Sequence, residues 1–526
     1  MKKIILFIIF FSFCISCNSI KQHNAQLNDL ISENKLKSDV DFAYKKLQSL
    51  HPKLNWYISK KDLDFKFDSL KNTISKPMTS LEFYKKLSPV VSSVRQGHLI
   101  VSPAIKIYTT KETKAIAKKG ISPLSQFDFE LFNDKLYVVK NKSYDKSIKT
   151  GTEVVSINDK NPVDLIKEYN NYFSSDGLNK TFKKNYSARA FTRFYIFENG
   201  YKDSLKYDFK FNDSIKTVYI KRKVIDTTGI NKKNNTKKLT TSEKEINKIK
   251  EKAIKIDKST YGYDDIAKRN NREFKFNEKD SSIAIIKINS FSKGDFSIFY
   301  EESFKKITDK KAKTLIIDLR NNSGGRLPEI SELYSYLADS TFVFLNKSEV
   351  VSKTSMFNID YFKGGSIFLK TLKVIGAPFV YSYLYFKVHK KNDGNYYFST
   401  YAKPQKLSSN AFKGKIYVLI NGGSFSASSI ISTNLKGSKR ATFVGEETGG
   451  AYNGTVAMMM PVVELPNSKN KIKIGLMACT PNYQTETFGR GVFPDKEITP
   501  TLEDRIKNND PEMNWILEDI KKNEMK

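Results

Sequence analysis

The stretch with the clearest potential for chemistry is residues 414–432, which read GKIYVLINGGSFSASSIIS. Residues 416–420 are continuously apolar and predict a buried strand, and residues 421–423 predict a turn. Small and apolar residues from Ser426 onward are spaced as in a closely packed helix. The unpaired N–H groups at the start of such a helix stabilise an oxyanion, so a serine held there can be a nucleophile. The alternative is that Ser424 or Ser426 only caps the helix.

A second stretch favours the nucleophile. Residues 315–325, LIIDLRNNSGG, form another apolar strand that runs into a polar turn and two glycines. Together the two stretches resemble the catalytic core of the C-terminal processing and tricorn-core serine peptidases. In that family a D-L-R-x-N-x-G-G element precedes a V-L-x-N-x-x-S-x-S-A-S element. The matching residues are Asp318, Leu319, Arg320, Asn322, Gly324, Gly325, Val418, Leu419, Asn421, Ser424, Ser426, Ala427 and Ser428.

The resemblance covers about Ser281 to Pro500 and implies a particular fold. The family fold is an α/β, ClpP/crotonase-like core built as a β-β-α superhelix, and strands alternate with helices in this part of the chain. The resemblance also implies that Ser426 is the nucleophile. Backbone N–H groups of Ala427 and of Gly324 or Gly325 would then form the oxyanion hole.

The serine needs a base, and the family offers two. One is a lysine shortly after a T-x-G element; the other is a remote histidine oriented by a carboxylate. Residues 444–451, VGEETGGA, match the T-x-G region and put the lysine position at or near Ala451, but no lysine occurs between Ala441 and Ser468. The histidine version is therefore expected.

His98 is the expected base. The chain has four histidines, and only His98 lies in an element that resembles the D-G-H-T sequence of the tricorn branch. Here residues 96–99 read QGHL, so the Gly-His pair is kept and both flanking residues differ. The alternative is a structural histidine.

The orienting carboxylate is expected in the C-terminal part of the core. The tricorn branch has an E-N-x-G-V-x-P-D element there, and residues 485–495 read TETFGRGVFPD, which is longer by two residues. The resemblance implies Glu486, with Glu446 or Glu447 in reserve. The alternative for Glu486 is a solvated loop carboxylate.

The rest of the chain divides into several expected parts. Residues 148–158, IKTGTEVVSIN, resemble the middle of a PDZ-like domain, although a Gly-rich carboxylate-binding loop is not evident. Residues 361–398 are rich in aromatic side chains and predict either an inserted helix packed on the core or an apolar wall over the substrate groove. The expected division is a helical N-terminal region with His98 (39–115), a β-rich PDZ-like domain (116–223), a Lys/Asn-rich linker or insertion (224–280), the catalytic domain (281–510) and a C-terminal tail (511–526).

The first residues predict a membrane anchor. Met-Lys-Lys is followed by the apolar residues 4–13, and residues 14–18 read CISCN. This pattern resembles a bacterial lipoprotein signal of residues 1–17 with lipid attachment at Cys17, and residues 18–38 would be a tether. The alternative is a plain signal peptide. A lipid-anchored protein of the cell envelope is expected.

Composition excludes several function classes. The chain of 526 residues has a net charge of +33, but the excess lysine is spread from end to end and no nucleic-acid-binding motif accompanies it. The sequence contains no Cys/His ligand cluster and no phosphate-binding loop, so neither a metal nor a cofactor is expected.

The predicted function is hydrolysis of unfolded or C-terminally presented polypeptides through an acyl-enzyme. One alternative is a non-catalytic peptide-binding lipoprotein with the same fold. Another is an enzyme that uses a different base on ester or amide substrates. The sequence sets no oligomeric state.

Overall fold

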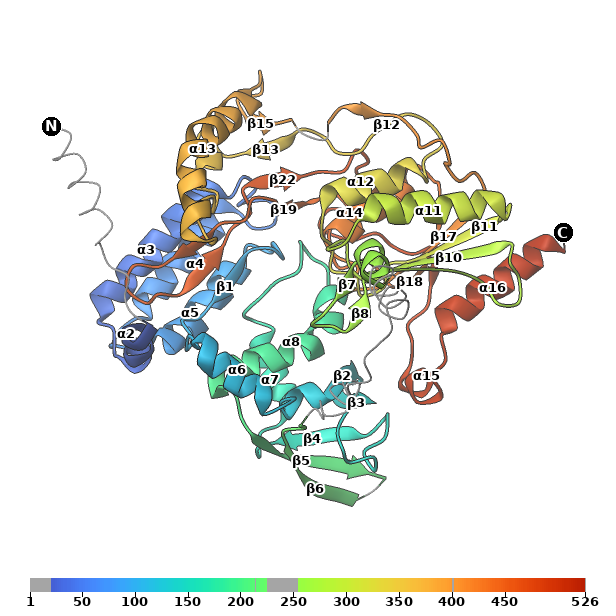
Figure 1. The fold of residues 1–526 in the computed structure, drawn as a ribbon. Helices are drawn as coiled ribbons and strands as arrows, with labels where there is room; N and C mark the ends of the chain where they lie inside the picture. The colour runs from blue at the N-terminus through green and yellow to red at the C-terminus, as the bar shows by residue number, and fades with distance from the viewer. Residues whose placement is uncertain (1–19, 213, 225–253, 400–401, 526) are drawn as a thin grey trace, which may run out of the picture.

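The structure is a computed structural model that describes residues 20–212, 214–224, 254–399 and 402–525 (Figure 1). The predicted signal sequence with Cys17 lies outside the described residues, as does about half of the predicted linker. The described chain is a mixed α/β protein, as expected from the sequence.

A six-stranded sheet forms the core of the C-terminal half. Its strand order is β23-β18-β17-β11-β10-β9, and all neighbours run parallel except β9. The strand predicted at the start of residues 315–325 is confirmed as β11 (Thr314–Asp318), and all five of its residues are buried, as expected for a strand covered on both faces. The other bounds are β9 (Arg272–Phe276), β10 (Ile283–Ile288), β17 (Lys415–Ile420), β18 (Thr442–Gly445) and β23 (Lys496–Glu497).

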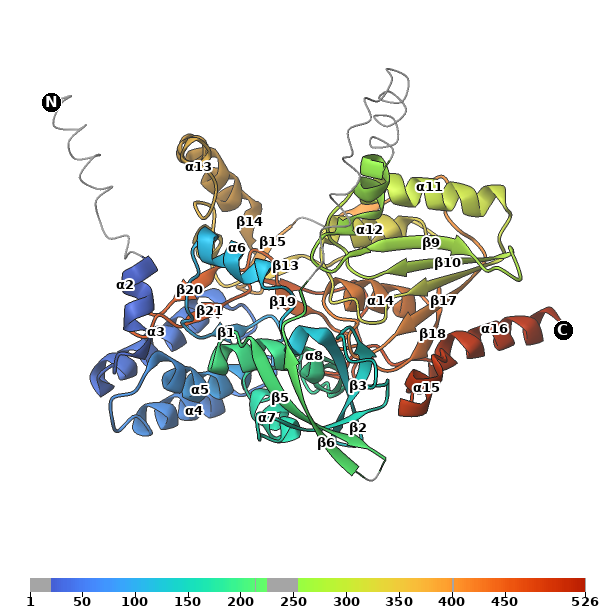
Figure 2. The same cartoon turned by 60° about the horizontal axis from the view of Figure 1, so that its bottom comes forward.

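Helices cover both faces of this sheet (Figures 1 and 2). On one face lie α11 (Phe296–Asp309), α12 (Leu327–Ser335) and α14 (Ala427–Gly437). On the other face α16 (Pro511–Glu524) packs Ile516 and Ile520 against β17 and β18. The segment expected to be a C-terminal tail is therefore part of the core, joined to it through α15 (Leu502–Lys507).

Strand β9 lies within the segment that was expected to be a linker. Its Arg272 is fully buried and forms an ion pair with Glu329 of α12 at 2.7 Å. The alternation of charged and apolar residues in REFKF marks an edge strand, but it follows a long lysine- and asparagine-rich stretch that hides the pattern. Two short strands, β7 (Tyr263–Asp264) and β8 (Arg269–Asn270), precede it.

The N-terminal region is helical, as predicted. It consists of α2 (Ile20–Ala25), η1 (Gln26–Asn28), α3 (Glu33–Leu50), α4 (Lys60–Asn72) and α5 (Ser80–Ser92). A capping box formed by Thr79 and Glu82 starts α5. The expected tether is much shorter than 18–38, because the chain is helical from Ile20 and α2 is bound to the body through His23 and Asn24.

The β-rich region is a five-stranded antiparallel sheet in the order β2-β3-β4-β5-β6. A short helix, α7 (Pro162–Tyr169), follows β4. A longer helix, α8 (Thr181–Asn199), was not expected in this region and packs against the edge strand β2. The bounds are α6 (Thr110–Lys118), η2 (Leu124–Gln126), β2 (Phe127–Phe132), β3 (Lys135–Asn141), β4 (Glu153–Ile157), β5 (Ser204–Phe211) and β6 (Ser214–Lys221).

Three smaller sheets connect these parts. One has the order β1-β21-β20, one has the order β14-β15-β13-β22-β19, and β12 pairs with β16. Their bounds are β1 (Ile100–Ser102), β12 (Phe342–Val343), β13 (Ser348–Val350), β14 (Val388–Lys390), β15 (Tyr396–Phe398), β16 (Pro404–Gln405), β19 (Thr455–Ala457), β20 (Val462–Glu464), β21 (Lys471–Lys473) and β22 (Met477–Cys479).

The aromatic stretch forms α13 (Ile367–Lys387), preceded by η3 (Ser355–Asn358). The expected helix packs on the core along one side only: Leu384 is buried and Val380 and Tyr381 pack against the core, while most of α13 is exposed. The helix projects from the body in both views (Figures 1 and 2).

Candidate active site

Ser426 occupies a strained junction between β17 and α14. Its backbone has φ 58° and ψ −119°, a region that costs a non-glycine residue free energy unless the surroundings hold it. The turn before it is tied to β11, because Ser424 Oγ donates to the Leu319 carbonyl at 2.7 Å and Asn421 Nδ2 donates to Asn321 Oδ1 at 2.9 Å. The sequence predicted this strand-turn-helix, and the structure has it.

His98 reaches Ser426 from a different part of the chain. It lies between α5 and β1, and its Nε2 is 3.0 Å from Ser426 Oγ. The imidazole stacks on Phe425, with ring centroids 4.9 Å apart. A Cβ on Gly97 would lie 2.5 Å from the Phe425 ring, so only glycine before His98 leaves room for this stacking.

The glycine turn after β11 lies against the serine. A Cβ on Gly324 would be 2.7 Å from Ser426 Cβ and 2.8 Å from the Ala427 nitrogen. The Gly324 N–H itself donates to Asn322 Oδ1 at 2.9 Å, so it is not free to bind an oxyanion. Among the described residues, no hydrogen bond occupies the N–H of Gly325 or Ala427.

A threonine takes the other side of the histidine. His98 Nδ1 is 3.0 Å from Thr455 Oγ1, at the start of β19. The buried carboxyl group of Asp176 lies near Thr455 and accepts the Gly97 N–H at 2.8 Å, and its Oδ2 has no hydrogen-bond partner among the described residues. Both Thr455 and Asp176 are buried. Ser426, His98, Thr455 and Asp176 therefore form one row of polar groups.

Hydrogen bonds hold together the three loops that carry His98, Thr455 and Asp176. The Gly177 N–H donates to the Arg95 carbonyl at 2.8 Å. The Val456 N–H donates to the buried Gln96 Oε1 at 3.3 Å. Gln96 stands where the family element has aspartate, and here its side chain fixes the strand that carries Thr455.

The structure does not bring Glu486 to His98. The side chain of Glu486 is exposed, and both imidazole nitrogens have other partners. The reserve residues are engaged elsewhere: Glu446 pairs with Lys184 at 3.0 Å, and Glu447 pairs with Arg490 at 2.7 Å. The 485–495 loop is two residues longer than the family element, and its glutamate does not reach the histidine.

Burial sets the ionisation of the row. Desolvation, assisted by the nearby charge of Lys473, lowers the pKa of His98 to about 4. Desolvation raises the pKa of Asp176 to about 6, although hydrogen bonds from Gly97, Thr455 and Ala451 oppose it. At neutral pH the imidazole is therefore neutral and able to accept a proton, while Asp176 is ionised.

Sequence reasoning missed Thr455 and Asp176. Neither lies in an element that resembled the family, and Asp176 belongs to the β-rich region, far from the catalytic core in the chain. The sequence around Asp176, SSDG, signals only a turn. The contact depends on tertiary packing between regions.

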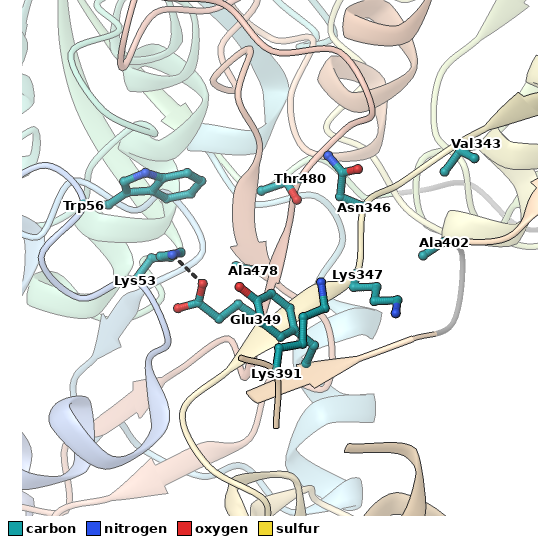
Figure 3. Close-up of a pocket in the computed structure, with 11 residues that line it drawn as sticks. Lys53, Trp56, Val343, Asn346, Lys347, Glu349, Lys391, Ala402, Ala478 and Thr480 are labelled. Atoms are coloured by element: carbon teal, nitrogen blue, oxygen red, sulfur yellow. Dashed lines mark ion pairs between the residues drawn. The ribbon is translucent and has the colours of Figure 1, made fainter. Parts of the chain in front are cut away.

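The pocket drawn in Figure 3 lies away from this row and has a volume of about 510 Å³. An ion pair between Lys53 and Glu349 spans its wall at 2.5 Å. Neither Ser426 nor His98 lines it, and we assign it no catalytic role. No group of three or more His, Cys, Asp or Glu side chains among the described residues is arranged to hold a metal ion.

A serine at a strained helix start, paired with a neutral histidine beside free backbone N–H groups, is the arrangement of a serine hydrolase. Residues 282–498 match the model of peptidase family S41. The carboxy-terminal-processing protease of Bartonella bacilliformis is 28% identical over 205 residues, which is 39% of this chain and 35% of that protein. In this region the chain is similar to peptidase family S41 and to the carboxy-terminal-processing proteases.

Solved structures extend the similarity of fold to nearly the whole chain. The structure of mature CPAF complexed with lactacystin superposes with a TM-score of 0.59 at 13% identity, covering 93% of this chain and 98% of that one. Another structure of mature CPAF gives 0.53 at 14% identity, covering 90% of this chain and 94% of that one. The N-terminal regions are thus part of a shared architecture.

We predict that His98 resists protonation until the pH falls to about 4. Replacing Lys473 with Met should raise the pKa of His98 toward its ordinary value, since a like charge is removed. Lys473→Arg keeps the charge and should leave the pKa low. NMR of histidine-labelled protein, with the His98 signal assigned by His98→Gln, measures these values. A His98 pKa of 6 or above in the unsubstituted protein would contradict this account.

Proposed function

We propose that the protein is a serine peptidase in which Ser426 is acylated by its substrate. The observation that carries the proposal is the 3.0 Å contact between Ser426 Oγ and His98 Nε2 at the N-terminus of α14. The S41 match of the surrounding domain supports it. A non-catalytic binding protein would have no use for a serine in a strained backbone conformation beside a neutral histidine.

The reaction would follow from this geometry. His98 Nε2 takes the hydroxyl proton as Ser426 Oγ attacks the scissile carbonyl, and it gives that proton to the leaving amine. The N–H groups of Gly325 and Ala427 bind the oxyanion; losing one such donor typically costs about 2.7–4 kcal/mol. Water then attacks the acyl-enzyme with His98 again as base.

Thr455 and Asp176 would position the base. In the tautomer that the reaction needs, His98 Nδ1–H donates to Thr455 Oγ1, and the threonine hydroxyl donates to the Asp176 carboxylate. A hydroxyl can accept and donate at once, so Thr455 links the two groups. The ionised Asp176 then stabilises the imidazolium without touching it. In this proposal Thr455 and Asp176 orient His98, which is the role expected for Glu486.

The substrate class is proposed to be unfolded or C-terminally presented polypeptides. The relative's name, carboxy-terminal-processing protease, supports this, as does a PDZ-like interpretation of the β2–β6 sheet. A pocket of about 320 Å³ lies between edge strand β2 and helix α8 and extends to Asn321 and Asn421 of the catalytic turns. A peptide added to β2 would lead toward Ser426. Photocross-linking of a substrate peptide to β2 would test this, and cross-links found only elsewhere would exclude it.

The cell envelope is the proposed location, with lipid attached to Cys17. The N-terminal sequence supports this, and homology to the carboxy-terminal-processing proteases is consistent with an envelope enzyme. Metabolic labelling with palmitate, compared between the full chain and Cys17→Ala, tests the anchor. Equal labelling of the two would exclude Cys17 as the site.

The peptidase proposal predicts that the chain from residue 18 onward cleaves an unfolded protein. Ser426→Ala should abolish cleavage, because no nucleophile remains. His98→Ala should lower kcat/KM by at least ~10²-fold, the usual contribution of a general base. Gel and mass-spectrometric analysis of casein digestion measures both, and cleavage by Ser426→Ala at the wild-type rate would refute the proposal.

The positioning role predicts a specific pH dependence. In the unsubstituted enzyme kcat should fall as the pH drops through about 6, because Asp176 becomes protonated. Thr455→Val should lower kcat by at least ~10-fold, and by less than the ~10⁴-fold caused by losing a directly bound aspartate. It should leave KM unchanged and abolish the step near pH 6.

Thr455→Ser is the matched control, since it keeps the hydroxyl and should keep both the rate and the step. If Thr455→Val retains full kcat with the same pH profile, Thr455 does not position His98.

A further inference from the structure

Helix α13 carries two apolar stripes, and only one of them is used within the molecule. The inner stripe, at Ala377, Val380, Tyr381 and Leu384, is at least partly buried against the body. The outer stripe repeats every three or four residues and is exposed, from 48% at Leu372 to 77% at Phe379. Its members are Phe368, Leu372, Ile375, Phe379, Tyr383 and Phe386. Large exposed apolar patches of this kind mark interaction sites.

Contacts with the body fix the helix in place, so the outer stripe remains exposed. Tyr381 packs against Phe357 and Tyr361, with ring centroids 5.3 Å and 6.0 Å apart. Lys373 Nζ donates to the Lys363 carbonyl at 2.9 Å and fixes the start of the helix to the preceding loop. The inner stripe therefore points into the body and the outer stripe away from it.

The charges around the stripe favour an anionic partner. Residues 367–387 contain no Asp or Glu, and they include Lys370, Lys373 and Lys387. Lys363, which precedes the helix, is ion-paired with Asp360 at 2.8 Å, while Lys390 and Lys391 follow the helix. Aromatic and aliphatic side chains flanked by lysines suit the boundary between lipid headgroups and acyl chains, where lysine stems extend to the anionic surface.

The position of α13 fits a membrane near the N-terminus. The segment before α13 is tied to β20, since Lys363 Nζ donates to the Val462 carbonyl at 2.9 Å. At the opposite edge of the same three-stranded sheet, beyond β1, α2 is tied through Asn24 to Ile107. Both views show α2 and α13 on the same side of the molecule (Figures 1 and 2).

The proposed lipid at Cys17 would be three residues from Ile20, at most about 10 Å of chain. It would therefore hold this side of the molecule against the bilayer. This step alone rests on the proposed anchor; the apolar stripe and its charges do not depend on it.

We propose that α13 binds the surface of an anionic lipid membrane through its outer stripe. The helix is 21 residues long and is the one helix among the described residues that is long and apolar enough to cross a membrane. At about 1.5 Å per residue it would just match a hydrocarbon core of about 30 Å. Its inner stripe is packed on protein, however, so α13 lies in the interface and does not span the bilayer.

Vesicle binding tests the proposal. The chain from residue 18 onward keeps every described residue and has no lipid of its own. It should sediment with vesicles of phosphatidylcholine and phosphatidylglycerol, and more weakly with phosphatidylcholine alone. The triple variant Phe368→Ser/Phe379→Ser/Phe386→Ser should lose at least tenfold in partition coefficient.

The matched control removes three equally exposed apolar side chains elsewhere, Ile215→Ser/Tyr219→Ser/Ile266→Ser. It should bind vesicles like the unsubstituted chain. Reaction of Ser426 with a fluorophosphonate checks that both variants are folded, and vesicle binding itself needs no peptidase activity.

Two results would overturn the proposal. One is equal vesicle binding by the α13 variant and the unsubstituted chain. The other is no vesicle binding together with a dimer in sedimentation analysis that the α13 variant converts to monomer, which would assign the outer stripe to a second copy of the chain.

Discussion

The site depends on the backbone strain at Ser426. A serine with φ 58° persists only because both flanking elements are fixed: β17 lies inside a sheet covered on both faces, and α14 is buried along most of its length. Gly324 leaves room for this junction, since any Cβ there would collide with it. In this conformation the hydroxyl lies 3.0 Å from His98 Nε2, and no hydrogen bond within the described part of the chain occupies the Ala427 N–H. The packing free energy of the core therefore offsets the backbone strain on which the proposed chemistry depends.

Packing between distant regions of the chain brings His98 to Ser426. The 95–98 loop, the 174–178 loop and the start of β19 hold one another through Arg95, Gln96 and Asp176. The row from Ser426 to Asp176 thus crosses three parts of the chain that are distant in sequence. A change in the packing of the N-terminal or β-rich region would move His98 or its support, so those regions are coupled to the proposed reaction.

The sequence predicts the core well because its signals are local. The apolar runs of β10, β11 and β17 and the glycine turns after them mark buried strands and close backbone contacts, and the capping box at Thr79 marks the start of α5. It does not predict Thr455 and Asp176, because a hydroxyl and a carboxylate become partners of His98 only when three loops meet. Strand β9, helix α16 and the exposure of α13 were missed for the same reason: their roles depend on what packs against them.

The most direct test of the central claim is to locate the bond that the enzyme forms. The chain from residue 18 onward would be treated with a fluorophosphonate, digested and mapped by mass spectrometry. This account predicts a single phosphonylated residue, Ser426, formed much more slowly in His98→Ala. An adduct on another serine, or none in a protein that cleaves casein, would contradict the assignment of Ser426 as the nucleophile.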